Sequence, residues 1–295
     1  RGNNLEKFDY KEFINRNIGF VTEEQQHQIQ SSKIFVCGVG GMGGACVNSL
    51  ARMGIEDITI ADIDDFELSN INRQVFANAD TLGKSKVFST QEQLLKLNPN
   101  INITSYEKDW PDSLDKICNK NKIIINGTDD VLATLLIYRK AKMHGCTVID
   151  AYASPLPSVY VVKPDDPRPE ETLNFPTIGK SLDEITSDDI DVCVFKEIEF
   201  VMTHSSSVKY IDIEIAAEYM AGKRSRMSIA PMVIGTGNMM AYEVLFAILN
   251  KPSGADNKGY FWNPYKGKIE KPRNPLLAFF IKALVRRFLN KLLKD

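Results

Sequence analysis

Short apolar runs alternate with longer amphipathic segments along the first half of the chain. The runs that predict strands are "KIFVC" (33–37), "DITIAD" (57–62), "INITSY" (101–106), "KIIIN" (122–126) and "CTVIDA" (146–151). Amphipathic patterns predict helices over residues 43–53, 85–97 and 131–144. Short strands rich in Ile and Val, separated by helices, are typical of a doubly wound, Rossmann-like, mostly parallel sheet with helices on both faces. We therefore expect an α/β fold that binds ligands where the strand carboxyl ends meet.

The same pattern divides the chain into five parts. Residues 1–30 are polar and predict a helical arm, and residues 31–163 form the predicted Rossmann-like core. Residues 164–225 are rich in proline and acidic residues, and they predict a crossover loop excursion with one helix at "YIDIEIAAEYMAG". Residues 226–272 predict a buried helix and a final strand or hairpin, a mixed C-terminal extension of the core. Residues 273–295 predict a basic amphipathic helix.

That last helix, "PLLAFFIKALVRRFLNKLLKD", combines many apolar residues with a basic rim. The basic residues are Lys282, Arg286, Arg287, Lys291 and Lys294. Our first interpretation is a helix packed on the domain or on a dimer partner. The alternative is that residues 276–294 lie on a membrane surface, because apolar faces with basic rims bind there.

Composition narrows the class of protein. The 295 residues are 43% hydrophobic and 25% charged, with a formal net charge of −2. This is typical of a soluble globular protein, and without a basic excess we expect no nucleic-acid partner. No run of about 18 apolar residues predicts a membrane-spanning helix. The five cysteines form no Cys-x-x-Cys pair, so we expect no structural zinc and a reducing, cytoplasmic setting.

A glycine-rich turn follows the first predicted strand. Gly38-x-Gly40-x-x-Gly43, with Gly41 inside it, matches the fingerprint in which backbone approaches a nucleotide's phosphates. Asp62 follows Gly43 by 19 residues and ends the second strand, where an acid binds a ribose hydroxyl. These features predict a nucleotide site, but they do not distinguish NAD from ATP.

The next segment favours ATP. It reads "DIDDFELSNINRQVF", and its polar and charged residues are Asp62, Asp64, Asp65, Ser69, Asn70, Arg73 and Gln74. Arg73, together with Lys86 from "LGKSK", predicts cations that stabilise charge on a departing pyrophosphate. "INGTDD" ends the fourth strand with Asp129 and Asp130, and a carboxylate there suits Mg²⁺ bound to phosphates. An NAD-dependent oxidoreductase remains an alternative.

These motifs together resemble the ThiF/MoeB/HesA family of adenylating proteins, which are related to ubiquitin-activating enzymes, in a variant without zinc. The resemblance covers about residues 12–155, and residues 226–250 more weakly. It implies ATP- and Mg²⁺-dependent adenylation of a carboxylate with release of pyrophosphate. It further implies that the glycine loop and Asp62 bind adenosine, that Asn70, Arg73 and Lys86 bind the phosphates, and that Asp129 binds magnesium.

The resemblance also bears on partners and substrates. "NRNIGF" resembles a family segment whose arginine reaches the partner subunit's ATP site, which implies a homodimer with Arg16 acting in trans. The implied substrate is the C-terminal carboxylate of a ubiquitin-like protein or a peptide, with a small carboxylate as a second option. A third option is the dehydratase branch that acts on threonylcarbamoyladenosine in tRNA, which "DVCVF" faintly resembles. The low net charge disfavours that option.

Some relatives transfer the activated acyl group to a crossover-loop cysteine, and Cys193 is the cysteine in that region here. Its apolar neighbours Val192, Val194 and Phe195 predict a buried strand and a structural role. A thiol nucleophile is the alternative, but it needs an accessible and electropositive setting. His204 is similarly expected to be an ordinary loop residue rather than part of a substrate pocket.

Overall fold

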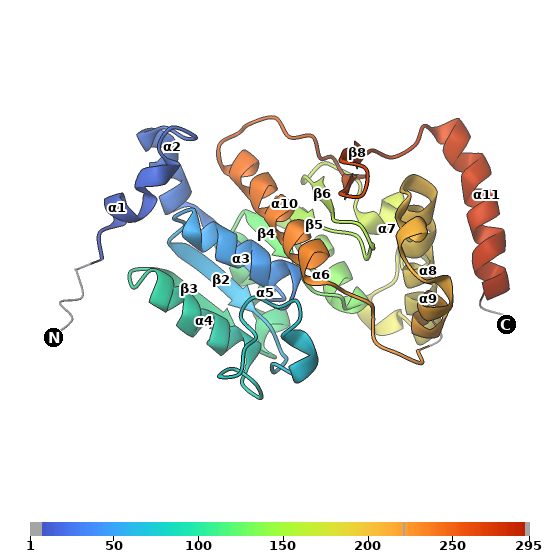
Figure 1. The fold of residues 1–295 in the computed structure, drawn as a ribbon, viewed down its shortest axis with the longest axis horizontal. Coiled ribbons are helices and arrows are strands. Elements are labelled where there is room, and N and C mark those ends of the chain that lie inside the picture. The colour runs from blue at the N-terminus through green and yellow to red at the C-terminus, as the bar shows by residue number, and fades with distance from the viewer. Residues whose placement is uncertain (1–7, 221, 293–295) are drawn as a thin grey trace.

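The computed structural model describes residues 8–220 and 222–292, and it is built around one eight-stranded sheet (Figure 1). The strand order is β3-β2-β1-β4-β5-β6-β7-β8, with the first five strands parallel and the last three antiparallel. The strands are β1 (Lys33–Cys37), β2 (Asp57–Ala61), β3 (Asn102–Tyr106), β4 (Ile123–Asn126), β5 (Thr147–Asp150), β6 (Ser158–Val162), β7 (Tyr260–Asn263) and β8 (Lys268–Glu270). This confirms the predicted fold class.

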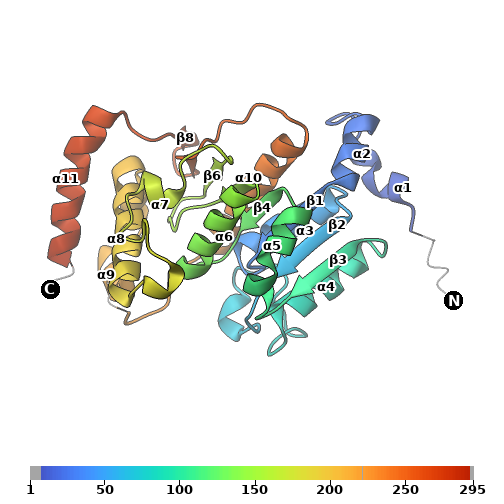
Figure 2. The same cartoon turned by 180° about the vertical axis from the view of Figure 1, so that it is seen from behind.

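Successive side chains along β1 point to opposite faces of the sheet. In β1, Ile34 and Val36 pack under α3 (Met42–Arg52), α4 (Lys86–Leu97) and α10 (Ala230–Ile248), which lie on one face (Figure 1). Phe35 and Cys37 pack under α5 (Trp110–Lys120) and α6 (Val131–Met143) on the other face (Figure 2). Because both faces are covered, the inner parallel strands β1, β2 and β4 and the neighbouring β5 are buried over most of their length, as expected, whereas the edge strand β3 is partly exposed.

Helix α5 lies between β3 and β4, and it is not among the helices predicted from the sequence. Trp110, Leu114, Ile117 and Cys118 are its buried residues. Their spacing of four, seven and eight positions from the first is that of one helical face. The signal was therefore present in the sequence.

The described part of the N-terminal arm is helical from Tyr10 onward, and residues 1–7 of the predicted arm lie outside the described residues. It consists of α1 (Tyr10–Ile14), a 3-10 turn η1 (Asn15–Asn17) and α2 (Glu23–Ser31). A capping box between Thr22 and Gln25 stabilises the first turn of α2. The Asn17 side chain donates a hydrogen bond to the Met53 carbonyl (3.0 Å). The arm is therefore attached at the carboxyl end of α3, away from the glycine loop at the start of that helix.

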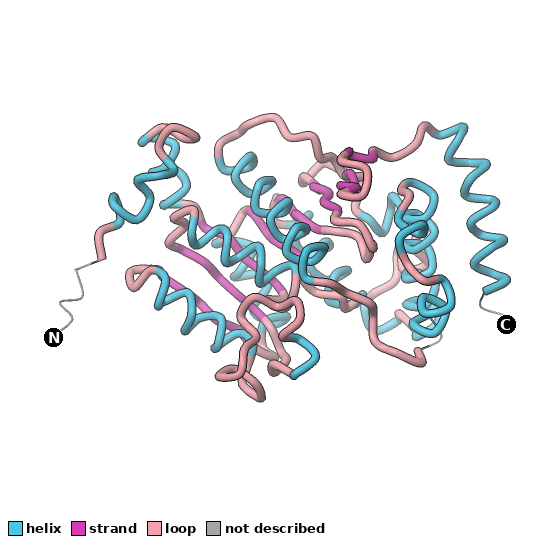
Figure 3. The backbone as a smooth tube through the Cα atoms, in the orientation of Figure 1, coloured by secondary structure: helices cyan, strands magenta, loops and turns pink. Residues whose placement is uncertain are grey.

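The longer elements of the crossover region are helices (Figure 3). It contains α7 (Pro169–Thr172), η3 (Leu182–Glu184), α8 (Ser187–His204), η4 (Ser207–Tyr210) and α9 (Ile213–Met220). The predicted strand around Cys193 is therefore wrong. A Thr186–Asp189 capping box begins α8, and Val192 and Val194 are partly exposed on it, 40% and 37%. They are surface residues of a helix rather than inner residues of a strand.

Helix α10 has the length and apolar composition of a membrane-spanning helix, the one such helix among the described residues. It is nevertheless a core helix in this structure, since Met240 and Val244 are fully buried and pack with α3 residues against the sheet. The two helices approach closely at Gly237, where an added Cβ would lie 2.6 Å from the Cβ of Ala45.

The C-terminal helix α11 (Pro275–Leu292) packs along α8, at the opposite end of the molecule from α1 (Figure 1). Leu289 is buried, and Arg286 makes a bidentate ion pair with Glu199 of α8 (2.6 and 3.0 Å). Leu276, Phe279, Phe280 and Leu284 remain 60–72% exposed. One face of α11 therefore packs on the domain, as first predicted, while a second apolar face is open. Lys294 lies outside the described residues.

Candidate functional site

A cleft of about 1200 Å³ opens at the carboxyl ends of β1, β2 and β4. Strand order changes direction between β1 and β4, and open α/β sheets bind ligands at such a point. The predicted site residues that line the cleft are Gly38, Gly40, Gly41, Asp62, Asp64, Asn70, Arg73, Gln74, Lys86 and Asp129. The structure thus brings together residues spread over some 90 positions of the sequence.

The glycine loop packs so closely against neighbouring backbone that it has no space for side chains on the side facing away from the cleft. Gly38 has a φ of +82°, and an added Cβ would lie 2.6 Å from the Gly127 carbonyl carbon. At Gly43, which packs beneath the cleft, an added Cβ would lie 1.9 Å from the Gly38 carbonyl oxygen. The loop therefore approaches both β4 and the first turn of α3, and it presents bare backbone to the cleft.

Asp62 organises the end of β2. One of its carboxylate oxygens accepts a hydrogen bond from the Val39 amide (2.8 Å), and the other accepts one from the Asp64 amide (3.0 Å). Burial raises the pKa of Asp62, although these bonds and Lys86 favour the ionised form. Each oxygen keeps a second lone pair, so the carboxylate can still accept a hydrogen bond from a ligand.

Two of the predicted cations, Lys86 and Arg73, lie along the cleft. The Lys86 ammonium is 2.8 Å from the Asp64 carboxylate, and Lys86 is 8% exposed. Arg73 donates from Nη1 to the Ser69 carbonyl (2.7 Å) and to the Asn72 side-chain oxygen (2.8 Å). Both cations are thereby oriented by the 62–76 loop, and they can face an anion bound against the glycine loop.

Two buried amides complete this wall. The Asn70 oxygen accepts a hydrogen bond from the Glu67 amide (3.1 Å). The Gln74 side chain lies against Gly40, and its Oε1 is buried without a hydrogen-bond partner among the described residues. Since buried polar atoms are normally paired, this atom is a candidate ligand contact.

Asp129 is exposed inside the cleft, whereas Asp130 caps α6 by accepting a hydrogen bond from the Ala133 amide (2.6 Å). Within the described ranges, no group of three or more His, Cys, Asp or Glu side chains could hold a metal ion. One carboxylate nevertheless fits Mg²⁺, because that ion is commonly held by one or two carboxylates plus phosphate oxygens and water.

Three other predicted residues lie elsewhere. The Ser69 side chain is exposed outside the cleft and bonds to Glu67. Arg16 is exposed on η1, beside the carboxyl end of α3, whose 11 residues span about 16 Å. Cys193 is 1% exposed, and burial raises its pKa to about 11, which favours a structural role over a nucleophilic thiol.

Other cleft residues were not predicted. Lys108 and Trp110 follow β3, so their place at a strand carboxyl end was a usable signal. Arg226, Met232 and Val233 come from the other end of the chain, and packing of α10 on α3 brings them to the cleft.

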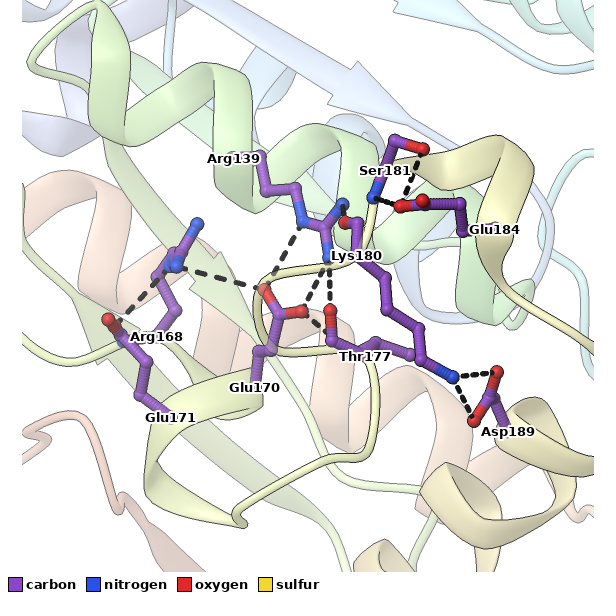
Figure 4. A network of polar contacts seen from close by, with 9 residues as sticks. All are labelled: Arg139, Arg168, Glu170, Glu171, Thr177, Lys180, Ser181, Glu184 and Asp189. Carbon is purple, nitrogen blue, oxygen red and sulfur yellow. Dashed lines mark hydrogen bonds and ion pairs between the residues drawn. The ribbon is translucent and has the colours of Figure 1, made fainter.

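Leu182 and Asp183 reach the cleft from the crossover region, which an ionic network holds in place (Figure 4). Arg139 of α6 binds the buried Glu170 carboxylate (2.5 Å) and the Lys180 carbonyl (2.8 Å). Lys180 in turn pairs with Asp189 at the start of α8 (2.7 Å). The network fixes the chain on either side of the two cleft residues.

The chain is similar in sequence to proteins that are named as adenylyltransferases. The chain is 30% identical over 122 residues to the molybdopterin-synthase adenylyltransferase of Escherichia coli, covering 41% of this chain and 48% of that protein. It is 30% identical over 148 residues to the adenylyltransferase and sulfurtransferase UBA4 of Candida albicans, covering 48% and 33%. The chain thus matches about half the length of the first relative and a third of the second.

Solved structures show the same fold at lower identity. PaaA superposes with a TM-score of 0.61 at 23% identity, covering 92% of this chain and 86% of that one. The complex of E. coli MccB with AMPCPP and MccA superposes with a TM-score of 0.58 at 19% identity, covering 85% and 67%. The sequence pattern of the ThiF family matches residues 14–275, most of the chain. The chain therefore belongs to the ThiF family.

Proposed function

We propose that this protein is an ATP-dependent adenylyltransferase that activates a carboxylate as an acyl adenylate and releases pyrophosphate. The observation that carries the proposal is the gathering of Arg73, Lys86 and Asp129 around a bare glycine loop in one cleft. Membership of the ThiF family and the adenylyltransferase names of the relatives support it.

The mechanism follows from the charges in the cleft. A substrate carboxylate oxygen attacks the α-phosphorus of ATP, forming a new O–P bond as the bond to the β-phosphate breaks. Negative charge accumulates on the leaving pyrophosphate, where Arg73 and Lys86 stabilise it. The residues act by positioning and by charge, so this step needs no protein nucleophile.

Asp129 is the residue that would hold Mg²⁺ at the phosphates, and the ion would supply further neutralisation of their charge. The glycine loop and Asp62 would bind the adenosine part of the nucleotide. The Gln74 oxygen beside Gly40, which has no hydrogen-bond partner within residues 8–220 and 222–292, adds an acceptor on the same side of the cleft.

Exchange of radiolabelled pyrophosphate into ATP tests the proposal, with peptide and carrier-protein carboxylates as substrates. We expect Arg73→Ala and Lys86→Ala each to lower the exchange rate about 10²- to 10³-fold. Lys84→Ala, an exposed lysine two positions before Lys86, is the matched control. Full exchange by both cleft variants would refute the assigned roles.

Nucleotide choice has a separate test. ATP with Mg²⁺ should raise the unfolding temperature of the protein, whereas NAD should not. Protection by NAD alone would favour the oxidoreductase, the alternative that the glycine pattern leaves open.

We further propose that the protein works as a homodimer in which Arg16 completes the partner's cleft. Arg16 lies near the far end of α3 from the glycine loop of its own chain, which supports action in trans. Mixing equal amounts of Arg16→Ala and Lys86→Ala proteins should then restore about a quarter of the wild-type sites, because half of the dimers are mixed and each has one intact site. No recovery after verified subunit exchange would exclude action in trans.

The proposed substrate is the carboxylate of a protein or peptide C-terminus. The relatives named as adenylyltransferases and the fold neighbour solved with MccA support this class. A tRNA substrate has less support, because the chain carries a net charge of −2. Stimulation of exchange by modified tRNA, and by no peptide or protein, would reverse this preference.

A further inference from the structure

A second cavity adjoins the nucleotide cleft. It has a volume of about 350 Å³ and lies between α8, η4, α9, the segment that precedes α10 and the end of α11. Its lining is mainly apolar and includes Ile198, Val201, Met202, Val208, Ala216 and Leu289. Volume and lining are those of a small ligand pocket.

The two cavities share a wall. Arg226, Ser228 and Met232 line both of them. The Ser228 carbonyl accepts a hydrogen bond from the Asn72 side chain (3.1 Å), which attaches this wall to the loop that carries Arg73. A group bound in the small cavity therefore lies beside the phosphate-binding side of the cleft.

Arg226 is the charged residue of this wall. It makes no hydrogen bond or ion pair with any other residue in the part of the chain that the structure describes. Arg226 lies near enough to Glu197 to favour the ionised form of that buried carboxyl group, and Glu197 accepts a hydrogen bond from the Ala153 amide (2.8 Å). The guanidinium is thus available to a carboxylate that enters at the junction.

We propose that the small cavity binds a bulky apolar group next to the reacting carboxylate of the substrate, and that Arg226 binds that carboxylate at the junction. The substrate C-terminus then ends in a residue such as leucine or phenylalanine rather than glycine. This inference rests on the proposed adenylation, and it specifies which carboxylates the same cleft selects.

The size and chemistry of the cavity favour this occupant. A glycine terminus would leave an apolar cavity of 350 Å³ empty beside the reaction centre. A leucine or phenylalanine side chain would occupy part of it and lose its contact with water, which should strengthen binding about 10- to 100-fold over glycine.

N-acetylglycine, N-acetylalanine, N-acetyl-leucine and N-acetylphenylalanine are suitable probes, because they differ only in that side chain. Their binding to the full chain with saturating AMPCPP can be measured by ligand-observed NMR, and their pyrophosphate exchange can be measured in parallel. We expect the leucine and phenylalanine acids to bind at least tenfold more tightly than the glycine acid. Equal affinities, tighter binding of the glycine acid, or no binding of any acid would overturn the inference.

A variant that fills the small cavity shows whether the preference for apolar acids arises in that cavity. Ala216→Phe should abolish the preference for the apolar acids and leave the ATP affinity unchanged. Ala217→Phe, on the same helix but not lining the cavity, should retain the preference. A preference that persists in Ala216→Phe would overturn the assignment.

A second variant tests the proposed contact between Arg226 and the substrate carboxylate. Arg226→Ala should weaken all four acids by about tenfold or more, whereas Arg224→Ala, an exposed arginine paired with Glu218, should not. Unchanged acid binding in Arg226→Ala would remove Arg226 from the proposal.

The experiments distinguish failure of the cavity assignment from failure of the proposed adenylation. Exchange that proceeds best with the glycine acid would overturn the inference and leave adenylation standing. Selective binding of the apolar acids, with no exchange and no ATP binding, would support the cavity assignment and overturn adenylation.

Discussion

The Lys86 ammonium and the Asp64 carboxylate lie 2.8 Å apart on the wall of the nucleotide cleft, with the lysine almost fully buried and Asp64 mostly exposed. The pair holds the lysine along the cleft rather than leaving it free to move. Asp64 therefore serves as a positioning residue for the cation that we assign to the pyrophosphate.

Asp64→Asn should lower kcat/KM for ATP in pyrophosphate exchange about tenfold, because Lys86 loses its orienting partner but keeps its charge. The loss should be smaller than that of Lys86→Ala. Asp80→Asn, which removes an exposed carboxylate outside the cleft, is the charge-matched control. If both Asn variants behave alike, the ion pair has no positioning role.

Gly43→Ala should destabilise the protein by about 1–3 kcal/mol, because the new methyl group would meet the Gly38 carbonyl oxygen and neither backbone segment can yield freely. Thermal unfolding measures the loss, and a fluorescent ATP analogue should bind more weakly. Gly254→Ala is the comparison, since nothing lies within 4 Å of its added Cβ. A wild-type unfolding temperature for Gly43→Ala would show that the loop relaxes more easily than its packing indicates.

Arg286→Ala should loosen α11 from α8. Glu199 is a buried carboxylate paired with Arg286 and Lys282, and removal of the bidentate partner leaves one ion pair at 3.3 Å. Because the arginine side chain is about half exposed, we expect a loss of only about 1–2 kcal/mol. Limited proteolysis within α11 should accelerate in this variant and not in Arg287→Ala, which makes no ion pair among the described residues.

The attachment of α11 should also depend on pH through His204. Burial, with Arg273, Lys258 and Lys282 nearby, lowers the pKa of His204 to about 4. Its neutral ring accepts a hydrogen bond from the Arg273 amide (3.1 Å) just before α11. Because the histidine pKa is about 6.5 in the unfolded chain, the unfolded state binds more protons between these values. The stability that this site contributes is complete above about pH 6.5 and is lost as the pH falls toward 4.

Hydrogen exchange of the first turns of α11, corrected for intrinsic rates, measures this effect locally. Protection should decrease from pH 7 to pH 5 in the wild type. His204→Asn keeps a neutral acceptor and should lose the dependence. The local measurement is needed because burial raises the pKa of Asp150 to about 6, which changes global stability in the opposite direction over the same range. An equal pH effect in the two proteins would contradict the role of His204.

The cysteines should be unreactive in the native state. All five are buried and free, and burial raises the pKa of Cys193 to about 11, so little thiolate forms at neutral pH. Ellman's reagent should therefore titrate five thiols only after denaturation. Cys193→Ala should keep pyrophosphate exchange if adenylation needs no thiol. Rapid labelling of Cys193 in the folded protein would reopen the possibility of a thioester step.

The centre of the sheet was predictable from the sequence because strands β1, β2, β4 and β5 are buried and therefore read as short apolar runs. The cleft residues near Gly38, Asp62 and Asp129 were predictable for a related reason. Each follows a strand directly, and parallel strands bring their carboxyl ends together.

The error at α8 has a physical cause. Val192 and Val194 belong to a short apolar run that resembles a buried strand, but they are surface positions of a helix. Glu199, by contrast, is buried because Arg286 reaches it from 87 residues away. A sequence pattern does not contain that pairing, and so the inner face of α8 was misread. Arg226 was missed for a similar reason, since long-range packing brings it to the cleft.

The close contact of α10 with α3 at Gly237 has a consequence for the wall between the two cavities. Met42 and Gly41 border the cleft from one helix, and Met232 forms part of the dividing wall on the other. With no side chain at Gly237, the two helices touch directly, which leaves them little freedom to slide. The position of the dividing wall is therefore set when the protein folds rather than when a ligand arrives.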